Sequence, residues 1–311
     1  MAKNKPIYDV AGLGVSTVDL IHVVDELPGQ ELVQKAHQTL LQGGGPVATA
    51  LVTLARLGSR TAMIDRLGDD WRGRLILDEF EREGVAADQI EIEQGATSSI
   101  STVLVRKRDG ARTFVFSPGS SRDLGHGDIA DDIFGKTKIL HLNGRHMHAC
   151  LETAKTAQKS SVKVSFDGGA GRYRAELEAL IPLTDICIVA RQFAIQFSGA
   201  ASIDRSARQL LEAGPELVVI TAGVEGCWVF QKGQEPFHQP AFHIVDVVDT
   251  TGAGDAFHGA FLHGIVSGFD LRECARFASA VAGMNTRFLG GRAGIPSYEE
   301  VGFFLLEARR G

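Results

Sequence analysis

The chain has 311 residues, of which 44% are hydrophobic and 23% are charged, and its formal net charge is -6. This is the composition of an ordinary acidic globular protein, and it excludes the dense positive charge typical of proteins that bind nucleic acids or anionic membranes. The length allows two domains or one large α/β unit, and we expect one unit with a small appendage.

No segment predicts export or a membrane span. The N-terminal Met-Ala-Lys-Asn-Lys-Pro lacks the apolar region of a signal peptide. The uncharged stretch 36–55 is long enough to span a membrane, but it contains glycines, a proline and several polar side chains. The four cysteines form no Cys-x-x-Cys pair, so we expect reduced thiols and a cytoplasmic protein.

The first apolar run, 7–13, predicts a buried strand that ends in a glycine turn. Thr17 stands where the dinucleotide fingerprint Gly-x-Gly-x-x-Gly needs its last glycine, so the Rossmann pattern is incomplete. Asp19 follows, and it is either a ligand-binding carboxylate or a turn residue. The alternating segments over 20–42, broken by Pro28 and Gly29, predict strands that leave the core sheet and return.

A glycine run precedes the first predicted helix. Gly44, Gly45 and Pro46 lead into the apolar segment 47–55, and proline is common in the first turn of a helix. These glycines permit close backbone approach, and a helix N-terminus offers donors to an anion or to sugar hydroxyls. They could equally be plain loop residues.

Two further patterns define the N-terminal half. The strand-like run 61–67 and the helix-like run 71–83 continue a repeat of strand and helix, which is typical of a parallel sheet. The segments 99–106 and 112–116 alternate on either side of Asp109-Gly110, which predicts a β-hairpin. Together with 20–42, this hairpin could form a separate small sheet that serves as a lid or a dimer surface.

Polar side chains follow three predicted strands in the middle of the chain. Asn143 and Arg145 follow 139–142, Asp167 follows 162–166, and Arg191 follows 185–189. Parallel sheets bind ligands at the carboxyl ends of their strands, so substrate contacts are expected there. A histidine cluster lies nearby, but no further ligand spacing completes it and we do not predict a metal there; it comprises His141, His146 and His148.

The C-terminal third contains the stretch around which the chain is organised. Residues 242–248 predict a strand, 249–254 a glycine turn, and the apolar spacing after Asp255 predicts a helix. This turn directs backbone N–H groups and a helix dipole at one point, which favours an anion such as phosphate. Asp255 would then act as a base beside it, or would merely cap the helix. A helix over 271–284, a loop over 285–294 and a terminal helix from 298 follow.

Four separated motifs occur in an order and at separations typical of one family. They are Gly44-Gly45 with the helix to Gly58, the segment 67–73, the segment 221–226 and the signature 249–255. Together they resemble the PfkB carbohydrate kinases, the ribokinase-like sugar kinases, across essentially the whole chain. The resemblance implies a ribokinase-like three-layer α/β/α sandwich over 1–311, with a mostly parallel central sheet and a small β-sheet lid from about 20–42 and 98–117.

The resemblance also implies ATP-dependent phosphorylation of a sugar hydroxyl, with Mg²⁺ accompanying ATP, and a homodimer formed through the lid. Asp255 would be the base, and backbone N–H groups would hold the charge on the γ-phosphate. The anion-hole residues would be Gly252, Ala253 and Gly254. The substrate-side positions are Asp19, Gly44, Gly45 and Thr49. The nucleotide-side positions are Thr221, Gly223, Gly226 and Asn285. Asp249 and Thr251 lie where many relatives hold a potassium ion.

Two departures from the family pattern are evident. Thr49 stands where asparagine is usual, which shortens or removes one substrate contact. The Asn-x-x-Glu motif that organises magnesium and phosphate would fall on Ala190 and Phe193, neither of which can do that.

The runs around Gly44 and over 290–296 resemble the branch that includes sulfofructose kinase, and Arg145 matches its anion-binding arginine. Val33 and Phe116 replace the lysine and asparagine that would complete sulfonate recognition, so we do not assign that substrate. A ketose, a sugar acid and a phosphosugar all remain open. Arg145 favours an acidic substrate over a structural ion pair.

Two other functions remain to be weighed. A catalytically weak sugar or nucleotide sensor would explain the lost Asn-x-x-Glu pattern. An NAD-dependent dehydrogenase rests only on generic glycine turns, and the incomplete dinucleotide fingerprint argues against it.

Overall fold

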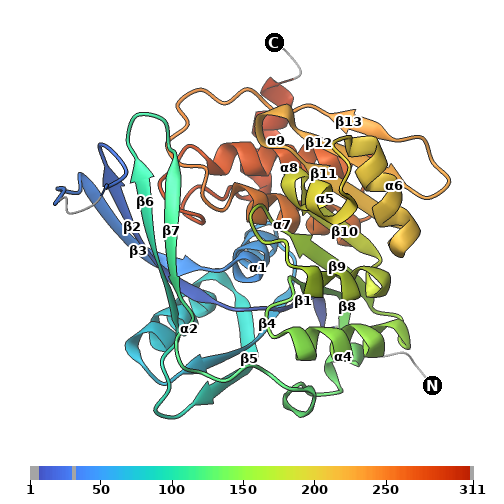
Figure 1. The fold of residues 1–311 in the computed structure, drawn as a ribbon, viewed down its shortest axis with the longest axis horizontal. Coiled ribbons are helices and arrows are strands. Elements are labelled where there is room, and N and C mark those ends of the chain that lie inside the picture. Colours follow the sequence, from blue (N-terminus) through green and yellow to red (C-terminus); the bar gives the residue numbers. More distant parts are fainter. Residues whose placement is uncertain (1–6, 30–32, 309–311) are drawn as a thin grey trace.

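The computed structural model describes residues 7–29 and 33–308 as a large sheet, a small sheet and surrounding helices (Figure 1). Within these residues, no helix is both long and apolar enough to cross a membrane. The strands are β1 Tyr8–Leu13, β2 Thr17–Val24, β3 Gln38–Gly44, β4 Thr61–Gly68, β5 Val85–Glu93, β6 Ser99–Arg106, β7 Arg112–Ser117, β8 Thr137–Leu142, β9 Lys163–Gly168, β10 Ile186–Ala190, β11 Leu217–Thr221, β12 Cys227–Gln231 and β13 Phe237–Gln239. The helices are α1 Pro46–Arg56, α2 Trp71–Glu83, α3 Ile133–Lys136, α4 Met147–Gln158, α5 Arg191–Ser198, α6 Ile203–Ala213, α7 Ala253–Ser267, α8 Leu271–Asn285 and α9 Tyr298–Glu307.

The large sheet has the order β13-β12-β11-β10-β9-β8-β1-β4-β5. Every neighbouring pair from β11 to β5 is parallel, and β12 and β13 add an antiparallel edge. The predicted mostly parallel sheet is therefore confirmed. Because the parallel strands run in one direction, the polar residues at their carboxyl ends meet along one edge of the sheet.

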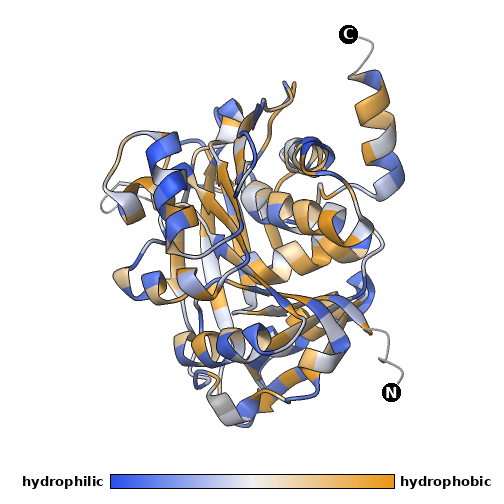
Figure 2. Cartoon of the chain, turned by 90° about the vertical axis from the view of Figure 1, so that its right-hand side faces the viewer, coloured by the Kyte–Doolittle hydropathy of each residue, from blue (hydrophilic) through white to orange (hydrophobic). Residues whose placement is uncertain are grey.

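Helices cover both faces of the large sheet, so the predicted three-layer α/β/α sandwich is confirmed (Figures 1 and 2). On one face, Leu51 of α1, Phe80 of α2 and Phe261 of α7 belong to one buried cluster, which continues into α8 and α9. On the other face, helices α4, α5 and α6 contribute to a second cluster with the sheet, which includes Phe166 and Phe193. Strands buried on both faces explain the continuous apolar runs in the sequence.

The small sheet has the order β3-β2-β6-β7, and it contains the predicted hairpin. Residues directly opposite one another in neighbouring strands share a face. Asp19 is opposite Gln42 and Ser101, and Ser101 is opposite Phe116, so these side chains lie on one face. The neighbouring residue in each strand points to the other face of the small sheet. These residues are Leu20, Leu41, Thr102 and Val115.

The strand predicted over 242–248 is wrong. The chain is irregular there, Asp246 has a positive φ of 64°, and Val245, Val247 and Val248 are exposed. Phe242, in this segment, packs against a helix instead, since its ring centre lies 5.2 Å from that of Phe304 in α9. An apolar run can thus belong to a packed loop as well as to a strand.

Candidate active site

The turn before α7 and the first turn of this helix lie at the carboxyl edge of the large sheet and leave backbone groups accessible. Gly252 precedes the helix with φ 70°, and a Cβ on it would lie 2.6 Å from the Cα of Gly291, so a glycine is required. A Cβ on Gly254, in the first turn, would meet nothing within 4 Å. The first N–H groups of a helix have no partner within it, so this open turn is suited to an anion.

Asp249 joins this turn to the loop between α8 and α9. Its Oδ1 accepts hydrogen bonds from the N–H and the hydroxyl of Thr251 at 2.8 and 2.7 Å, and its Oδ2 accepts one from the Gly290 N–H at 2.9 Å. Asn285 is fully buried and donates to the Gly291 carbonyl at 3.1 Å. Both side chains therefore fix loops.

Asp255 lies in the first turn of α7, as predicted, with 19% of its side chain exposed. Burial raises its pKa, and the neighbouring Asp167 raises it further, whereas Arg172 opposes the shift. The guanidinium Nη1 of Arg172 is 3.7 Å from Asp255 Oδ1 and 3.5 Å from Asp167 Oδ2. A carboxylate with a raised pKa beside an anion site is typical of a general base.

Arg172 is a site residue that the sequence analysis missed. Burial alone would lower its pKa, but the charges of Asp255, Asp167 and Asp19 outweigh that effect and raise the pKa above its ordinary value. The available signal was weak: Arg172 lies in the glycine-rich loop after β9, at the edge where ligand contacts are expected.

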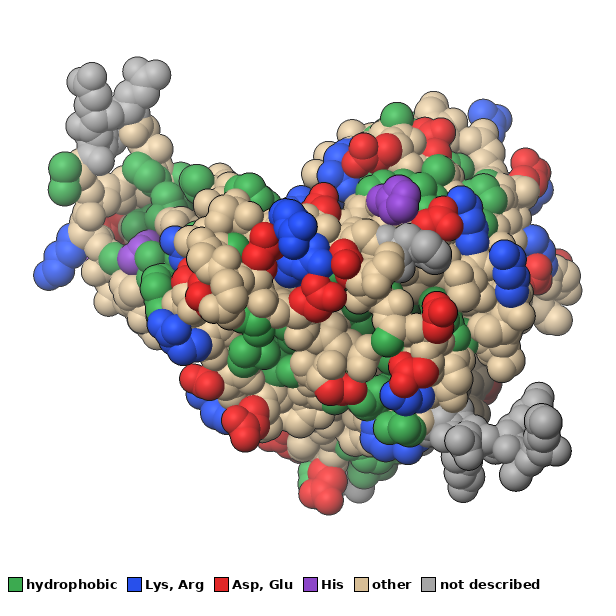
Figure 3. Space-filling model, turned by 90° about the horizontal axis from the view of Figure 1, so that it is seen from below, with side chains coloured by type: hydrophobic (Ala, Val, Ile, Leu, Met, Phe, Trp, Pro, Cys, Tyr) green, Lys and Arg blue, Asp and Glu red, His purple; other side chains and the backbone are tan. Residues whose placement is uncertain are grey.

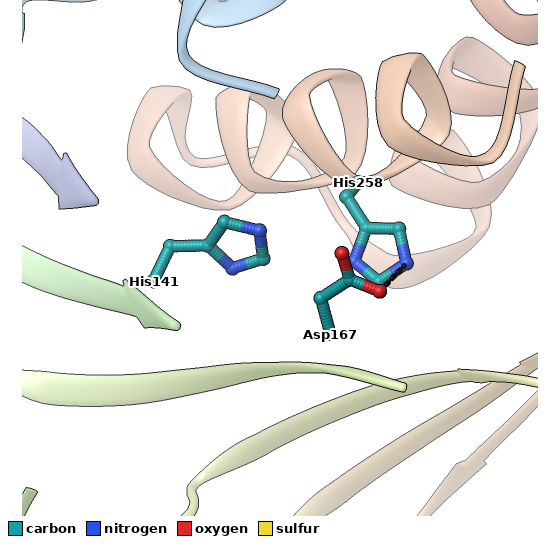
Figure 4. Close-up of side chains that lie close together, drawn as sticks. All are labelled: His141, Asp167 and His258. Atoms are coloured by element: carbon teal, nitrogen blue, oxygen red, sulfur yellow. Dashed lines mark ion pairs between the residues drawn. The ribbon is translucent and has the colours of Figure 1, made fainter. Parts of the chain in front are cut away.

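Behind Asp255, three buried side chains from β8, β9 and α7 point toward one another (Figure 4). His258 Nε2 lies 3.4 Å from Asp167 Oδ1, and His141 Nδ1 is 3.1 Å from Ser165 Oγ. Burial lowers the pKa of His141 to about 3 and that of His258 to about 4, so both imidazoles are neutral at neutral pH.

The ligand atoms of His141, Asp167 and His258 lie within 4.8 Å of one another, a grouping that could hold a metal ion. Arg172 already faces the Asp167 carboxylate, however, and its charge opposes a second cation there. The histidines that are close in sequence do not form one group, because His146 bonds to Asp65 and His148 is exposed.

Asp19 and the glycines after β3 form the opposite wall of the site. Asp19 is buried, and its Oδ1 accepts a hydrogen bond from the Thr17 hydroxyl at 2.8 Å. A Cβ on Gly44 would lie 2.1 Å from Asp19 Oδ2, so glycine leaves the space that the carboxylate occupies. Gly45 has φ 93° and begins α1. Burial raises the pKa of Asp19 and the charge of Asp255 adds to that shift, whereas the Thr17 hydrogen bond and the charge of Arg292 oppose it.

Thr49 lies in α1, and its side chain contacts Arg292. Its Oγ1 accepts a hydrogen bond from Arg292 Nε at 3.2 Å, and its side chain is buried. Because a hydroxyl can accept and donate at the same time, this bond leaves the Thr49 hydroxyl a proton to donate.

Arg145 lies beneath the small sheet. Its guanidinium is 5.0 Å from the centre of the Phe116 ring in β7, and no described residue forms an ion pair with it. Burial lowers its pKa and the nearby Arg174 and Arg172 lower it further, whereas the charges of Asp123 and Asp65 oppose the shift. An arginine without a carboxylate partner, close to other arginines, is suited to an anionic ligand.

The glycine turn after β11 lies further along the same edge. Thr221 ends the strand, and Gly223 and Gly226 have positive φ values of 57° and 92°. A Cβ on Gly226 would lie 2.1 Å from the Gln239 carbonyl oxygen. Glu225, within the turn, forms a two-pronged ion pair with Arg191 at the start of α5.

The position of the missing Asn-x-x-Glu motif is apolar in the structure as well. Ala190 ends β10 and begins α5. Phe193 is buried, with its ring 5.6 Å from Phe166 and 5.4 Å from Tyr173. These side chains extend the core, so this position supplies no ligand for a metal ion.

These walls enclose one region between the small sheet and the core. Figure 3 shows the surface hollowed between the lobe that carries the small sheet and the core, with basic and acidic side chains beside the hollow. The arrangement combines an open helix start, a carboxyl group with a raised pKa and an arginine without an ion-pair partner among the described residues, which is suited to transfer of an anionic group to an acceptor.

Residues 9–297 match the pfkB family carbohydrate kinase domain. An "Uncharacterized sugar kinase" of Archaeoglobus fulgidus is 33% identical over 249 residues, covering 78% of this chain and 98% of that protein. "Probable fructokinase-4" of Arabidopsis thaliana is 27% identical over 312 residues, covering 91% and 93%. The Arabidopsis thaliana ribokinase structure, complexed with ribose and ATP, superimposes with a TM-score of 0.83 at 24% identity, covering 96% of this chain and 98% of that one.

Replacing Asp255 by asparagine should stabilise the protein at neutral pH. The pKa of Asp255 is raised in the folded state, so its ionised form is less favourable there than in the unfolded chain, and the neutral amide removes that difference. We expect the melting temperature to rise by on the order of 2 °C at pH 7.5. The gain should vanish below about pH 4, where the carboxyl group is protonated in both states. The control is Asp109→Asn, because Arg106 lowers the pKa of Asp109; a gain for both variants, or for neither, contradicts the prediction.

Proposed function

Because the chain belongs to the pfkB family of carbohydrate kinases, we propose that it transfers the γ-phosphoryl group of ATP to a hydroxyl of a sugar or sugar derivative bound between the small sheet and the core. The position of Asp255 beside the open start of α7 supports this most directly. The bound ribose and ATP of the Arabidopsis thaliana ribokinase are in accord with it.

In the proposed reaction the sugar oxygen attacks the γ-phosphorus, the bond from phosphorus to the ADP oxygen breaks, and Asp255 accepts the hydroxyl proton. The backbone N–H groups of Gly252, Ala253 and Gly254 hold the charge on the phosphoryl oxygens. Before transfer, Arg172 favours the ionised form of Asp255, which a base requires.

On the substrate side, Asp19 accepts hydrogen bonds from sugar hydroxyls, and the backbone at Gly44 and Gly45 approaches the sugar closely. Arg145 binds an anionic group of a sugar acid or a phosphosugar. Its lack of an ion-pair partner among the described residues supports this choice over a structural role. A neutral ketose is the second candidate, favoured by the similarity to a probable fructokinase.

On the nucleotide side, Thr221, Gly223 and Gly226 contact ATP, and Asn285 is a further candidate near the adenine. Mg²⁺ would be held by the phosphates of ATP and would shield their charge; Ala190 and Phe193 offer it no ligand. A potassium ion would be held by backbone carbonyls of the loops that Asp249 and Thr251 fix, because the Asp249 oxygens already accept hydrogen bonds.

A homodimer through the small sheet completes the proposal. On the sheet face opposite Asp19, Leu41 is 43% and Val115 is 66% exposed. Apolar side chains on an exposed sheet face favour association with a second copy. The use of ATP and the four buried free cysteines are in accord with a cytoplasmic enzyme.

A sensor that binds sugar and nucleotide without efficient transfer is the alternative, and the apolar side chains of Ala190 and Phe193 favour it. A coupled assay of ADP release over a panel of sugars, sugar acids and sugar phosphates, with and without potassium, separates the two. Transfer above the background ATPase rate supports the kinase. Ligand-induced thermal shifts without transfer to any acceptor support the sensor.

Asp255→Asn should bind substrates normally but lose turnover, because asparagine cannot accept the proton. We expect kcat to fall by about a hundredfold or more. Dissociation constants for ATP and sugar should change by less than about threefold. Turnover near that of the wild type would refute the role of Asp255 as base.

Arg145→Met should discriminate between acidic and neutral substrates. Loss of a charge-assisted contact should raise KM for a sugar acid or phosphosugar by about tenfold or more, whereas KM for a neutral ketose should stay within about twofold. Arg145→Lys should be intermediate, since lysine cannot form a two-pronged contact. Equal effects on both substrate classes, or a wild type that prefers neutral sugars, would argue against recognition of an anion by Arg145.

Lysine at the exposed sheet positions should abolish the dimer. We expect the wild type to have the mass of a dimer in light scattering at micromolar concentration, and the double variant Leu41→Lys/Val115→Lys to have that of a monomer. Phe303→Lys, at an exposed apolar position on α9, is the matched control and should leave the dimer intact. A monomeric wild type, or a dimeric double variant, contradicts this interface.

A further inference from the structure

A buried ion pair lies where the small sheet returns to the core. Glu79 comes from α2, and Arg292 comes from the loop between α8 and α9. Arg292 Nη1 is 3.0 Å from Glu79 Oε1, and the two side chains are only 3% and 6% exposed. Removing both charges from water is costly, and apolar residues of similar volume often stabilise a core as well or better. A contribution to stability therefore does not by itself explain why this ion pair is present.

The hydrogen bonds of this pair converge on two glycines at the end of β3, Gly43 and Gly44, which we call the glycine hinge. Arg292 Nη2 donates to the Gly44 carbonyl at 2.8 Å, and the Gly43 N–H donates to Glu79 Oε2. Arg292 Nε also donates to Thr49 Oγ1 in α1. One ion pair thus fixes a carbonyl and an N–H of the hinge and connects them to two helices.

The hinge is held between this pair and the substrate-side carboxylate. A Cβ on Gly43 would lie 2.4 Å from Arg292 Nη1, and a Cβ on Gly44 would lie 2.1 Å from Asp19 Oδ2. The ion pair and Asp19 therefore press on adjacent residues of one backbone segment. A displacement of the hinge would alter both the backbone that faces the sugar and the space that Asp19 occupies.

We propose that Glu79 and Arg292 are positioning residues for the sugar, which hold the glycine hinge against the substrate. Neither side chain touches the sugar in this proposal; they act through the backbone of Gly43 and Gly44. This inference rests on the proposed sugar kinase activity. It assigns sugar affinity in part to the ion pair that fixes the glycine hinge.

The decisive comparison is between Arg292→Met and the double variant Glu79→Met/Arg292→Met. The single change leaves the Glu79 carboxylate buried without its partner, so the melting temperature should fall. The double change removes both charges and retains volume, so the melting temperature should return toward the wild-type value. Arg292→Met loses the hydrogen bond to the Gly44 carbonyl. The double variant also loses the hydrogen bond from the Gly43 N–H.

We expect KM for the sugar to rise about tenfold or more in the double variant despite its restored stability, with KM for ATP within about twofold of the wild type. Arg292→Lys, which retains the charge but not the planar fork, should recover part of the sugar affinity. Arg60→Met is the control: it removes an ion pair with Asp9 at the opposite end of the sheet and should leave both KM values unchanged. If sugar KM recovers together with stability in the double variant, the pair is purely structural and the proposal is overturned.

Hydrogen exchange of the segment 38–44 provides a measurement that does not depend on activity. The amide of Gly43 should exchange about tenfold or more faster in the double variant than in the wild type, while the amides of α7 remain protected. Unchanged exchange of Gly43 overturns the anchoring. Faster exchange in a protein that phosphorylates no acceptor would retain the anchoring and refute only the sugar kinase activity.

Discussion

Three carboxylates that surround one arginine constrain the whole site. Asp19, Asp167 and Asp255 come from distant parts of the chain, and all three raise the pKa of Arg172. Burial raises the pKa values of Asp19 and Asp255; the charge of Arg172 opposes this shift at Asp255, and the charge of Arg292 opposes it at Asp19. Buried carboxylates and arginines at this edge of the sheet thus partly offset one another's burial.

Glycine contacts bring the remaining parts of the site together. Gly252, at the start of α7, packs against Gly291, one residue before Arg292. Arg292 in turn contacts the glycine hinge, so residues 290–292 touch both the turn before α7 and the end of β3. A side chain at Gly43, Gly44 or Gly252 would overlap the neighbouring atoms. These segments can therefore approach one another closely only because glycine has no side chain.

The apolar residues at 190 and 193 show how the site departs from the family pattern without losing its architecture. Phe193 joins the core between Phe166 and Tyr173, which leaves this part of the nucleotide side without carboxylate ligands. Arg172, in the loop after β9, places positive charge near Asp255. Phosphoryl transfer depends mainly on position and charge, so such a change alters how charge is supplied and leaves the fold intact.

The sequence by itself determined the fold class and the family, and it predicted the residues of a candidate site. Short-range patterns encode these features: strand periodicity, the hairpin at Asp109 and Gly110, the turn before α7 and the polar residues that follow each parallel strand. It failed at 242–248, because an apolar run does not reveal whether it pairs with a strand or packs on a helix such as α9. Only the tertiary structure decided that Arg172 faces Asp255, that His141 meets His258, and that Glu79 pairs with Arg292 across 213 positions of the chain. These partners carry no local signal, since the free energy of a buried charge pair depends on which side chains the fold brings within a few ångströms.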